Sequence, residues 1–195
     1  MANFSDNFPV GSSNNLLEEI QASCDGSSHT VPSGTYTPQT VSAYQLSTNT
    51  HTDINGSSIT YTPPSGTNYV YYNFRFNINI ISNNYHSGHS SYRLYVGGTE
   101  VTAAGKHFST NYHPSYGHGV KQFDMGFTFN LTTSTDDIAN GEFSNWTAGK
   151  IIKVTGRQYN STYTVEWHGN KWRDGGGATG NYKWTRPILT IKALK

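Results

Sequence analysis

Histidine is the residue type in this chain whose spacing comes nearest to metal chemistry. His107, His113 and His118 fall within "KHFSTNYHPSYGHG", and His86 and His89 fall within "NNYHSGHSS". Imidazole nitrogens bind zinc, but zinc sites combine compact ligand spacings with a preorganised frame. Both segments are rich in Gly, Ser and Tyr and have no carboxylate pair nearby. We therefore predict no metal and no other cofactor, and we expect these side chains to be amphipathic contact residues.

The carboxylates offer little more for acid–base catalysis. The chain has 12 Asp and Glu residues, and the adjacent pair Asp136–Asp137 lies in "TTSTDDIANGE". Neighbouring side chains diverge in an extended segment, so this pair is better explained as a solvated turn. A cupin-type enzyme would need His and Glu ligands on facing strands, whereas the expected strands carry mainly Asn, Thr, Tyr and Gln. The sequence therefore predicts that the chain is not an enzyme.

Two long loops carry amphipathic residues that suit binding rather than catalysis. One loop runs from Asn111 to His118, and the other, "KWRDGGGATGNYKW", runs from Lys171 to Trp184. A phosphate-cradling glycine loop would need a helix after it, and none is expected here. Trp and Arg are frequent anchors of binding surfaces, although such aromatics can also simply cover the end of a sandwich. The candidate contact residues are Tyr112, His113, Tyr116, His118, Trp172, Arg173 and Trp184.

The elements that must hold these loops are β-strands. The clearest is "SGTNYVYYNFRFNINII", in which apolar and polar residues alternate over more than ten positions. The apolar positions are Val70, Tyr72, Phe74, Phe76, Ile78 and Ile80. The polar positions are Tyr71, Asn73, Arg75, Asn77 and Asn79. This pattern predicts a long strand with one face packed on a second sheet and the other facing water or a neighbouring subunit.

Further strands follow at intervals typical of a two-sheet sandwich. Gly97–Gly98 predicts a tight hairpin between "YRLYV" and "TEVT", because glycine accepts positive φ. The segments "SSITY", "GKIIKVTGRQY", "YTVEWHG" and "RPILTIKAL" also read as strands. In "KQFDMGFTFNL" the residues expected to point inward are Phe123, Met125, Phe127, Phe129 and Leu131. Altogether we predict an all-β antiparallel sandwich of eight or nine strands.

The composition of the chain limits the classes of partner that it can bind. Charged residues make up 13% of the chain, against about 25% in typical globular proteins. The formal net charge is +1 and no run of Lys or Arg occurs, so we expect no nucleic-acid partner. No apolar run has the roughly 20 residues of a membrane helix, and the N-terminus lacks the features of a secretory signal, so we expect no membrane insertion. One cysteine, Cys24, allows no intrachain disulfide.

Residues 1–28 differ from the β-rich remainder, residues 29–195. They are mostly small and polar, with one apolar cluster formed by Leu16, Leu17 and Ile20 in "NNLLEEIQASC". Asn14 or Asn15 could cap a short helical turn there. The segment is either a flexible tail or an arm that becomes ordered on a neighbouring protein. We predict an assembly arm that buries its apolar cluster on a partner.

The order of motifs resembles a family of viral proteins. These motifs are "CDGSS", "SGTYT", "INGSSITYTPPSGTNYVYYNFRF", "YRLYVGGTEVT", "GKIIKVTGRQY" and "RPILTIKAL". Over residues 17–195 they resemble the β-rich virion structural proteins of marine phages and large algal viruses. The Pro-Pro turn before the long strand and the terminal strand are the most specific parts. The pattern is also similar to the jelly-roll heads of trimeric fibres, which are related in shape to the C1q and tumour necrosis factor folds.

The resemblance implies a jelly-roll sandwich located on the particle surface as a fibre head, spike or capsid-decorating protein. It implies a homotrimer that acts in assembly and host attachment, with other virion proteins and a host surface glycan or protein as partners. It transfers no catalytic residue. A carbohydrate-binding module or lectin is the alternative, because it shares the sandwich and the aromatic loops.

Overall fold

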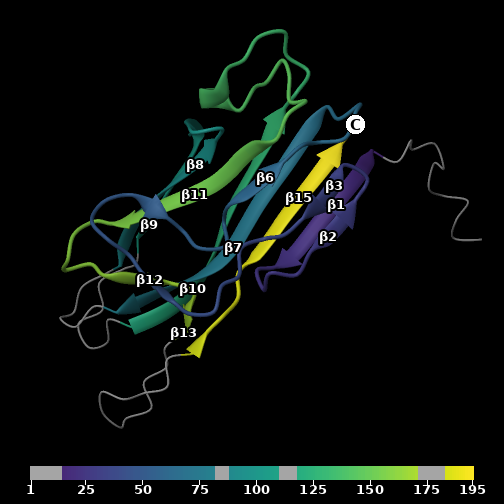
Figure 1. The fold of residues 1–195 in the computed structure, drawn as a ribbon. Coiled ribbons are helices and arrows are strands. Elements are labelled where there is room, and N and C mark those ends of the chain that lie inside the picture. Colours follow the sequence, from purple (N-terminus) through teal and green to yellow (C-terminus); the bar gives the residue numbers. More distant parts are fainter. Residues whose placement is uncertain (1–14, 82–87, 110–117, 171–182) are drawn as a thin grey trace, which may run out of the picture.

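The structure is a computed structural model that describes residues 15–81, 88–109, 118–170 and 183–195 (Figure 1). It confirms the all-β prediction: nearly every described element is a strand, and the strands pair antiparallel in two facing sheets. In these ranges the only helical element is the short 3₁₀-helix η2 (Ile138–Asn140). No helix in the described part has the length and apolar character needed to cross a membrane.

The strands form one six-stranded sheet, one five-stranded sheet and two small ribbons. The larger sheet contains β1 (Leu16–Ser23), β15 (Ile188–Leu194), β7 (Tyr69–Ile81), β10 (His118–Asn130), β12 (Val165–Trp167) and β4 (Gln45–Leu46). The smaller sheet contains β5 (Thr52–Asp53), β6 (Ile59–Tyr61), β11 (Lys150–Gln158), β8 (His89–Val96) and β9 (Thr99–Ser109). The ribbons are β2 (His29–Val31) with β3 (Gly34–Tyr36), and β13 (Gly169–Asn170) with β14 (Lys183–Trp184).

Strand pairing is nested around one hairpin. At its centre β8 pairs with β9 through Gly97 and Gly98, whose φ angles are 58° and 89° as the sequence predicts. Moving outward in the sequence from that turn, β7 pairs with β10, then β5 and β6 pair with β11, and finally β1 pairs with β15. The chain is therefore one long antiparallel ribbon folded over on itself, with successive pairs assigned alternately to the two sheets.

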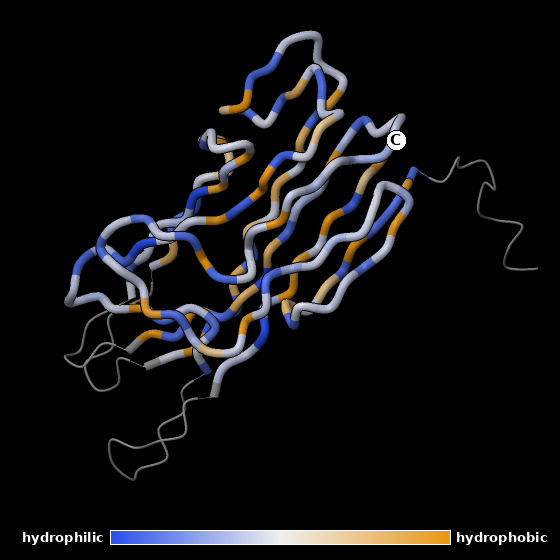
Figure 2. The backbone as a smooth tube through the Cα atoms, viewed as in Figure 1, coloured by the Kyte–Doolittle hydropathy of each residue, from blue (hydrophilic) through white to orange (hydrophobic). Residues whose placement is uncertain are grey.

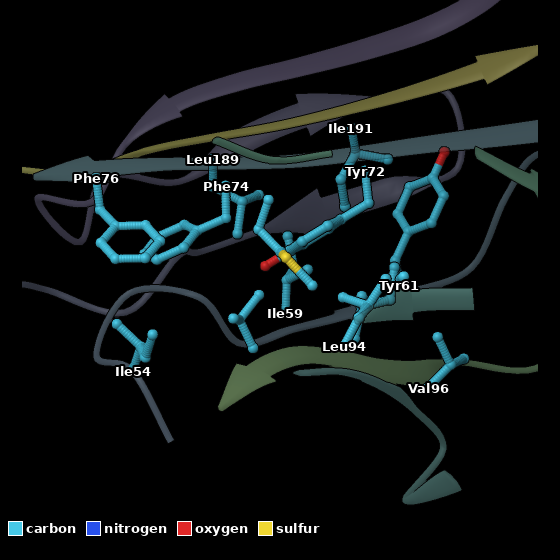
Figure 3. Packing of buried hydrophobic residues seen from close by; sticks show 14 of the residues in the cluster. Ile54, Ile59, Tyr61, Tyr72, Phe74, Phe76, Leu94, Val96, Leu189 and Ile191 are labelled. Atoms are coloured by element: carbon cyan, nitrogen blue, oxygen red, sulfur yellow. The ribbon is translucent and has the colours of Figure 1, made fainter. Parts of the chain in front are cut away.

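The alternation of the long strand places the core between the two sheets. All six apolar positions of β7 are at most 5% exposed. Tyr72, Phe74 and Phe76 among them point toward the smaller sheet, which contributes buried residues such as Leu94 and Val96 (Figure 3). Along the strands of both sheets hydrophobic and hydrophilic residues alternate (Figure 2). On β10 the predicted face is confirmed as well: Met125 and Phe129 are fully buried, while Phe123 and Phe127 are partly buried against the core.

The N-terminal segment differs from the prediction. Residues 16–23 form the strand β1 rather than a helical turn, and they pair with β15 at the edge of the larger sheet. Ile20 is 1% exposed in the core of this same chain, Leu17 is partly buried and Leu16 is 41% exposed. The boundary of the arm at residue 28 is therefore wrong, because β1 completes the sandwich. Residues 1–14 lie outside the described residues.

A hydrogen-bonded carboxylate explains why β1 can enter the core. Glu18 points inward and is 5% exposed. Its carboxylate accepts hydrogen bonds from the hydroxyl groups of Tyr61 and Ser33, both at 2.6 Å, and from the Ser33 backbone N–H at 2.9 Å. A buried carboxylate is tolerated when its oxygens are satisfied in this way. Glu18 thereby ties β1 to β6 of the opposite sheet and to the turn between β2 and β3.

The single cysteine is part of the core. Cys24 is fully buried and its thiol lies 3.4 Å from the Gly56 carbonyl oxygen. Burial, and to a lesser extent the nearby Asp25, raise its pKa to about 12. A thiol that stays protonated and has no exposed surface is a packing group rather than a nucleophile.

Candidate binding site

A pocket of about 410 Å³ opens where β8 begins and β9 and β11 end. This end of the sandwich is opposite to the one where β15 and the chain terminate (Figure 1). The volume lies within the range of small-ligand sites. Its lining residues are His89, Ser90, Ser91, His107, Phe108, Ser109, Arg157, Gln158, Tyr159 and Tyr163.

Strand register brings the outward-facing part of the lining together. Ser91 of β8 is opposite Arg157 of β11 on one side and His107 of β9 on the other. Side chains directly opposite each other across strands lie about 5 Å apart on the same face. Because Ser91 is small and its two neighbours are long, the middle of this row is hollow. The floor of the pocket is thus formed by a short side chain between a guanidinium and an imidazole.

Three rings form one wall of the pocket. His89 is 4.7 Å from Tyr163 and 6.4 Å from Tyr159 between ring centroids, and the two tyrosine rings are 5.6 Å apart. A tight turn brings the tyrosines together, because the Asn160 carbonyl accepts from the Tyr163 N–H and the Asn160 side chain accepts from the Thr162 N–H. Tyr159 is 61% exposed, so its ring is available to a ligand.

Of the lining residues that the structure describes, Arg157 is the one with a formal charge. Within the described part of the chain no carboxylate oxygen lies within 4.0 Å of it, whereas Arg75 pairs with Asp124 and Arg93 with Glu100. Its Nη1 lies 3.5 Å from the Asn49 carbonyl oxygen, at the outer limit of a hydrogen bond. The guanidinium therefore retains most of its capacity to bind an anion.

A second pocket at the opposite end is less suited to a ligand. It has a volume of about 400 Å³ and is lined by the turn at residues 63–67 and by Leu131 and residues 144–147. The aromatic ring in its described lining, Trp146, is 4% exposed and donates its indole N–H to the Tyr61 carbonyl. None of its described lining residues is charged. The pocket around Ser91 is therefore the better candidate.

Most of the predicted contact residues lie outside the described residues: Tyr112, His113, Tyr116, Trp172 and Arg173. The backbone of His118 begins β10 opposite Ile81. Trp184 lies on β14 and is half-buried against the core, with the Arg186 guanidinium 5.5 Å from its ring centroid. The structure therefore places Trp184 partly in the role of a cover on the sandwich.

The residues considered for catalysis and metal binding have other surroundings. Asp136 accepts two hydrogen bonds from Ser144, at the backbone N–H and the hydroxyl, which lower its carboxyl pKa. Asp137 caps η2 by accepting from Asn140. Both carboxylates thus brace a turn, as predicted. The described residues contain no group of three or more His, Cys, Asp or Glu side chains that could hold a metal ion.

The sequence reading missed Arg157, Tyr159 and Tyr163 as site residues. The local signal was present in "YNSTY", where an Asn one residue after a tyrosine predicts a turn that returns the chain to a second tyrosine. The placement of Ser91 between Arg157 and His107 left no local signal in the sequence, because it depends on the register of three strands. Models of known protein families do not match the chain, and a search of curated proteins finds no match either.

Proposed function

We propose that the chain is a structural protein of a virus particle, displayed at the particle surface as a fibre head, spike or capsid-decorating protein. The observation that carries the proposal is the nested ribbon of β1·β15, β5/β6·β11, β7·β10 and β8·β9. Numbered one to eight along the chain, these strands have the order 1-8-3-6 in one sheet and 2-7-4-5 in the other. This order supports a jelly roll, an architecture of viral capsid and lectin domains.

The outer face of the larger sheet supports a role in assembly. Among the described residues it presents amide and hydroxyl groups and two ion pairs, Arg75 with Asp124 at 2.8 Å and Lys192 with Glu19 at 3.1 Å. A face with matched charges and many hydrogen-bonding groups can contact a copy of itself without isolating a charge. Leu16, exposed on the edge strand β1, adds an apolar contact at the sheet margin. We propose a homotrimer on these grounds and on the sequence resemblance.

A lectin or carbohydrate-binding module is the second candidate function, and the aromatic wall around Tyr159 and Tyr163 favours it. Native mass spectrometry of the purified chain separates the two. A particle protein of the proposed kind gives a mass about three times the 21.5 kDa of one chain. A monomer at micromolar concentration would contradict the trimer and leave the lectin as the better explanation.

A further inference from the structure

We infer that the pocket around Ser91 binds a sugar that carries a carboxylate, such as a sialic or a uronic acid. The inference rests on the proposed role as a surface binding protein, and it names the chemical class of the ligand. Two halves of the pocket carry it: a polar floor with one guanidinium, and a wall of three rings.

The floor suits a carboxylate. A guanidinium binds a carboxylate through two parallel N–H···O bonds, which neither a hydroxyl nor a water reproduces. Arg157 is half-buried on β11 and has no carboxylate partner within the described residues. Among the described residues no Asp or Glu lines the pocket, so an entering anion meets no like charge from them. The hydroxyl of Ser91 lies next to the guanidinium, and His107 lines the pocket on the other side of Ser91; both offer further hydrogen bonds.

The wall suits a pyranose ring. Tyr159, Tyr163 and His89 are amphipathic: each ring has an apolar face that can cover the C–H surface of a sugar and a polar edge that stays hydrated. The edge-to-face contacts among them hold the rings in place before a ligand enters, which reduces the entropy lost on binding. The pocket volume of about 410 Å³ accommodates one or two sugar rings.

The two halves lie within one strand repeat of each other. His89 and Ser91 are two positions apart on β8, so their side chains share a face about 7 Å apart. This spacing lets one sugar place its ring on the wall and its carboxylate on Arg157. A neutral sugar uses only the wall, and an anion without a ring uses only the floor. The geometry therefore predicts selectivity for ligands that have both parts.

The test compares matched sugar pairs on the intact chain by isothermal titration calorimetry. One pair is sialyllactose and lactose; the other is cellobiouronic acid and cellobiose, so the two sources of a sugar carboxylate are separated. We expect at least one acidic sugar to bind, and Arg157→Gln to weaken that binding about tenfold to a hundredfold. Arg157→Lys, which keeps the charge but loses the paired geometry, should give an intermediate loss. Tyr159→Ala should weaken binding of the acidic and the neutral sugar alike.

Matched controls lie outside the pocket. Arg93→Gln removes an arginine from the same face of β8, and Tyr69→Ala removes a tyrosine that is 40% exposed at the other end of β7. Both should bind as the wild type does. The inference is overturned if no acidic sugar binds, if the neutral sugars bind equally well, or if Arg157→Gln leaves the preference unchanged. None of these results alters the mass of the assembly, so the proposed particle role is judged separately.

Discussion

Acid should destabilise this protein through one buried side chain, His168. The residue lies between β12 and β13 with a φ of 66°, is fully buried, and packs edge-on against the rings of Phe74 and Phe76 at centroid distances of 6.2 and 6.0 Å. Within the described residues neither ring nitrogen makes a hydrogen bond of normal geometry. Burial lowers its pKa to about 4, and the backbone of Asn55 opposes that shift only in part.

The size and sign of the effect follow from linkage. The unfolded chain takes up a proton at this histidine near its usual pKa of 6.5, whereas the folded chain does so only near pH 4. Between these values the unfolded state binds more protons, so the free energy of unfolding falls as the pH falls. The contribution is fully present above pH 6.5; about 2 kcal/mol of it is lost by pH 5 and about 3 kcal/mol by pH 4.

The assay is urea unfolding at pH 7 and pH 5, compared with a variant that cannot titrate. Asn tolerates positive φ, so His168→Asn suits the backbone at this position. The smaller side chain leaves a cavity, but its cost is the same at both pH values and cancels when the free energies of unfolding at pH 7 and pH 5 are subtracted. The wild type should lose about 2 kcal/mol more than His168→Asn over this interval. His29→Asn, on the partly exposed strand β2, is the control and should behave as the wild type does. Equal pH dependence of the wild type and His168→Asn would refute the reasoning.

Three further predictions concern the core and metal independence. Phe74→Ala should lower the free energy of unfolding by about 3–5 kcal/mol because the ring is fully buried. Phe127→Ala should lower it by less because that ring is partly exposed, and Thr128→Ala, at an exposed position, should hardly change it. Denaturant titration measures these losses, and equal losses would contradict the assigned faces. Glu18→Ala should cost about 2–3 kcal/mol because it leaves the Tyr61 and Ser33 donors unpaired, whereas the adjacent Glu19→Ala removes only a surface ion pair with Lys192; equal melting temperatures would disprove the tie between the sheets. Excess chelator should leave the melting temperature unchanged, and a drop reversed by zinc would revive a histidine site.

Strands with a clean period of two were predictable from sequence, and the N-terminal strand was not. In β7 every second side chain is apolar, so burial of one face fixes both the strand and its orientation. In "LLEEIQAS" the inward series is Glu18, Ile20 and Ala22, which begins with a carboxylate. Hydrogen bonds from Tyr61, 43 residues away in sequence, and from Ser33, 15 residues away, make that carboxylate acceptable in the core. A pattern read locally contains no sign of such a partner.

The candidate site, too, was predictable from the sequence only in part. The turn at Asn160 that joins Tyr159 to Tyr163 is encoded within five consecutive residues and could be read from the sequence. The position of Arg157 on one side of Ser91 and of His107 on the other depends on how β11, β8 and β9 are aligned. The hairpin at Gly97–Gly98 aligns β8 with β9 and is predictable from the sequence. The alignment of β11 with β8 depends on the return of the chain through β10, and composition and spacing do not specify that return.

The most direct test of the proposed function is to locate the chain on virus particles. Particles purified by density gradient from the source that encodes the chain are examined by quantitative mass spectrometry, and intact particles are labelled with an antibody against the purified protein. The proposal predicts that the chain co-sediments with the major capsid protein in a fixed ratio and that the antibody labels intact particles. A chain that is absent from the particles and recovered free in the soluble fraction would contradict it.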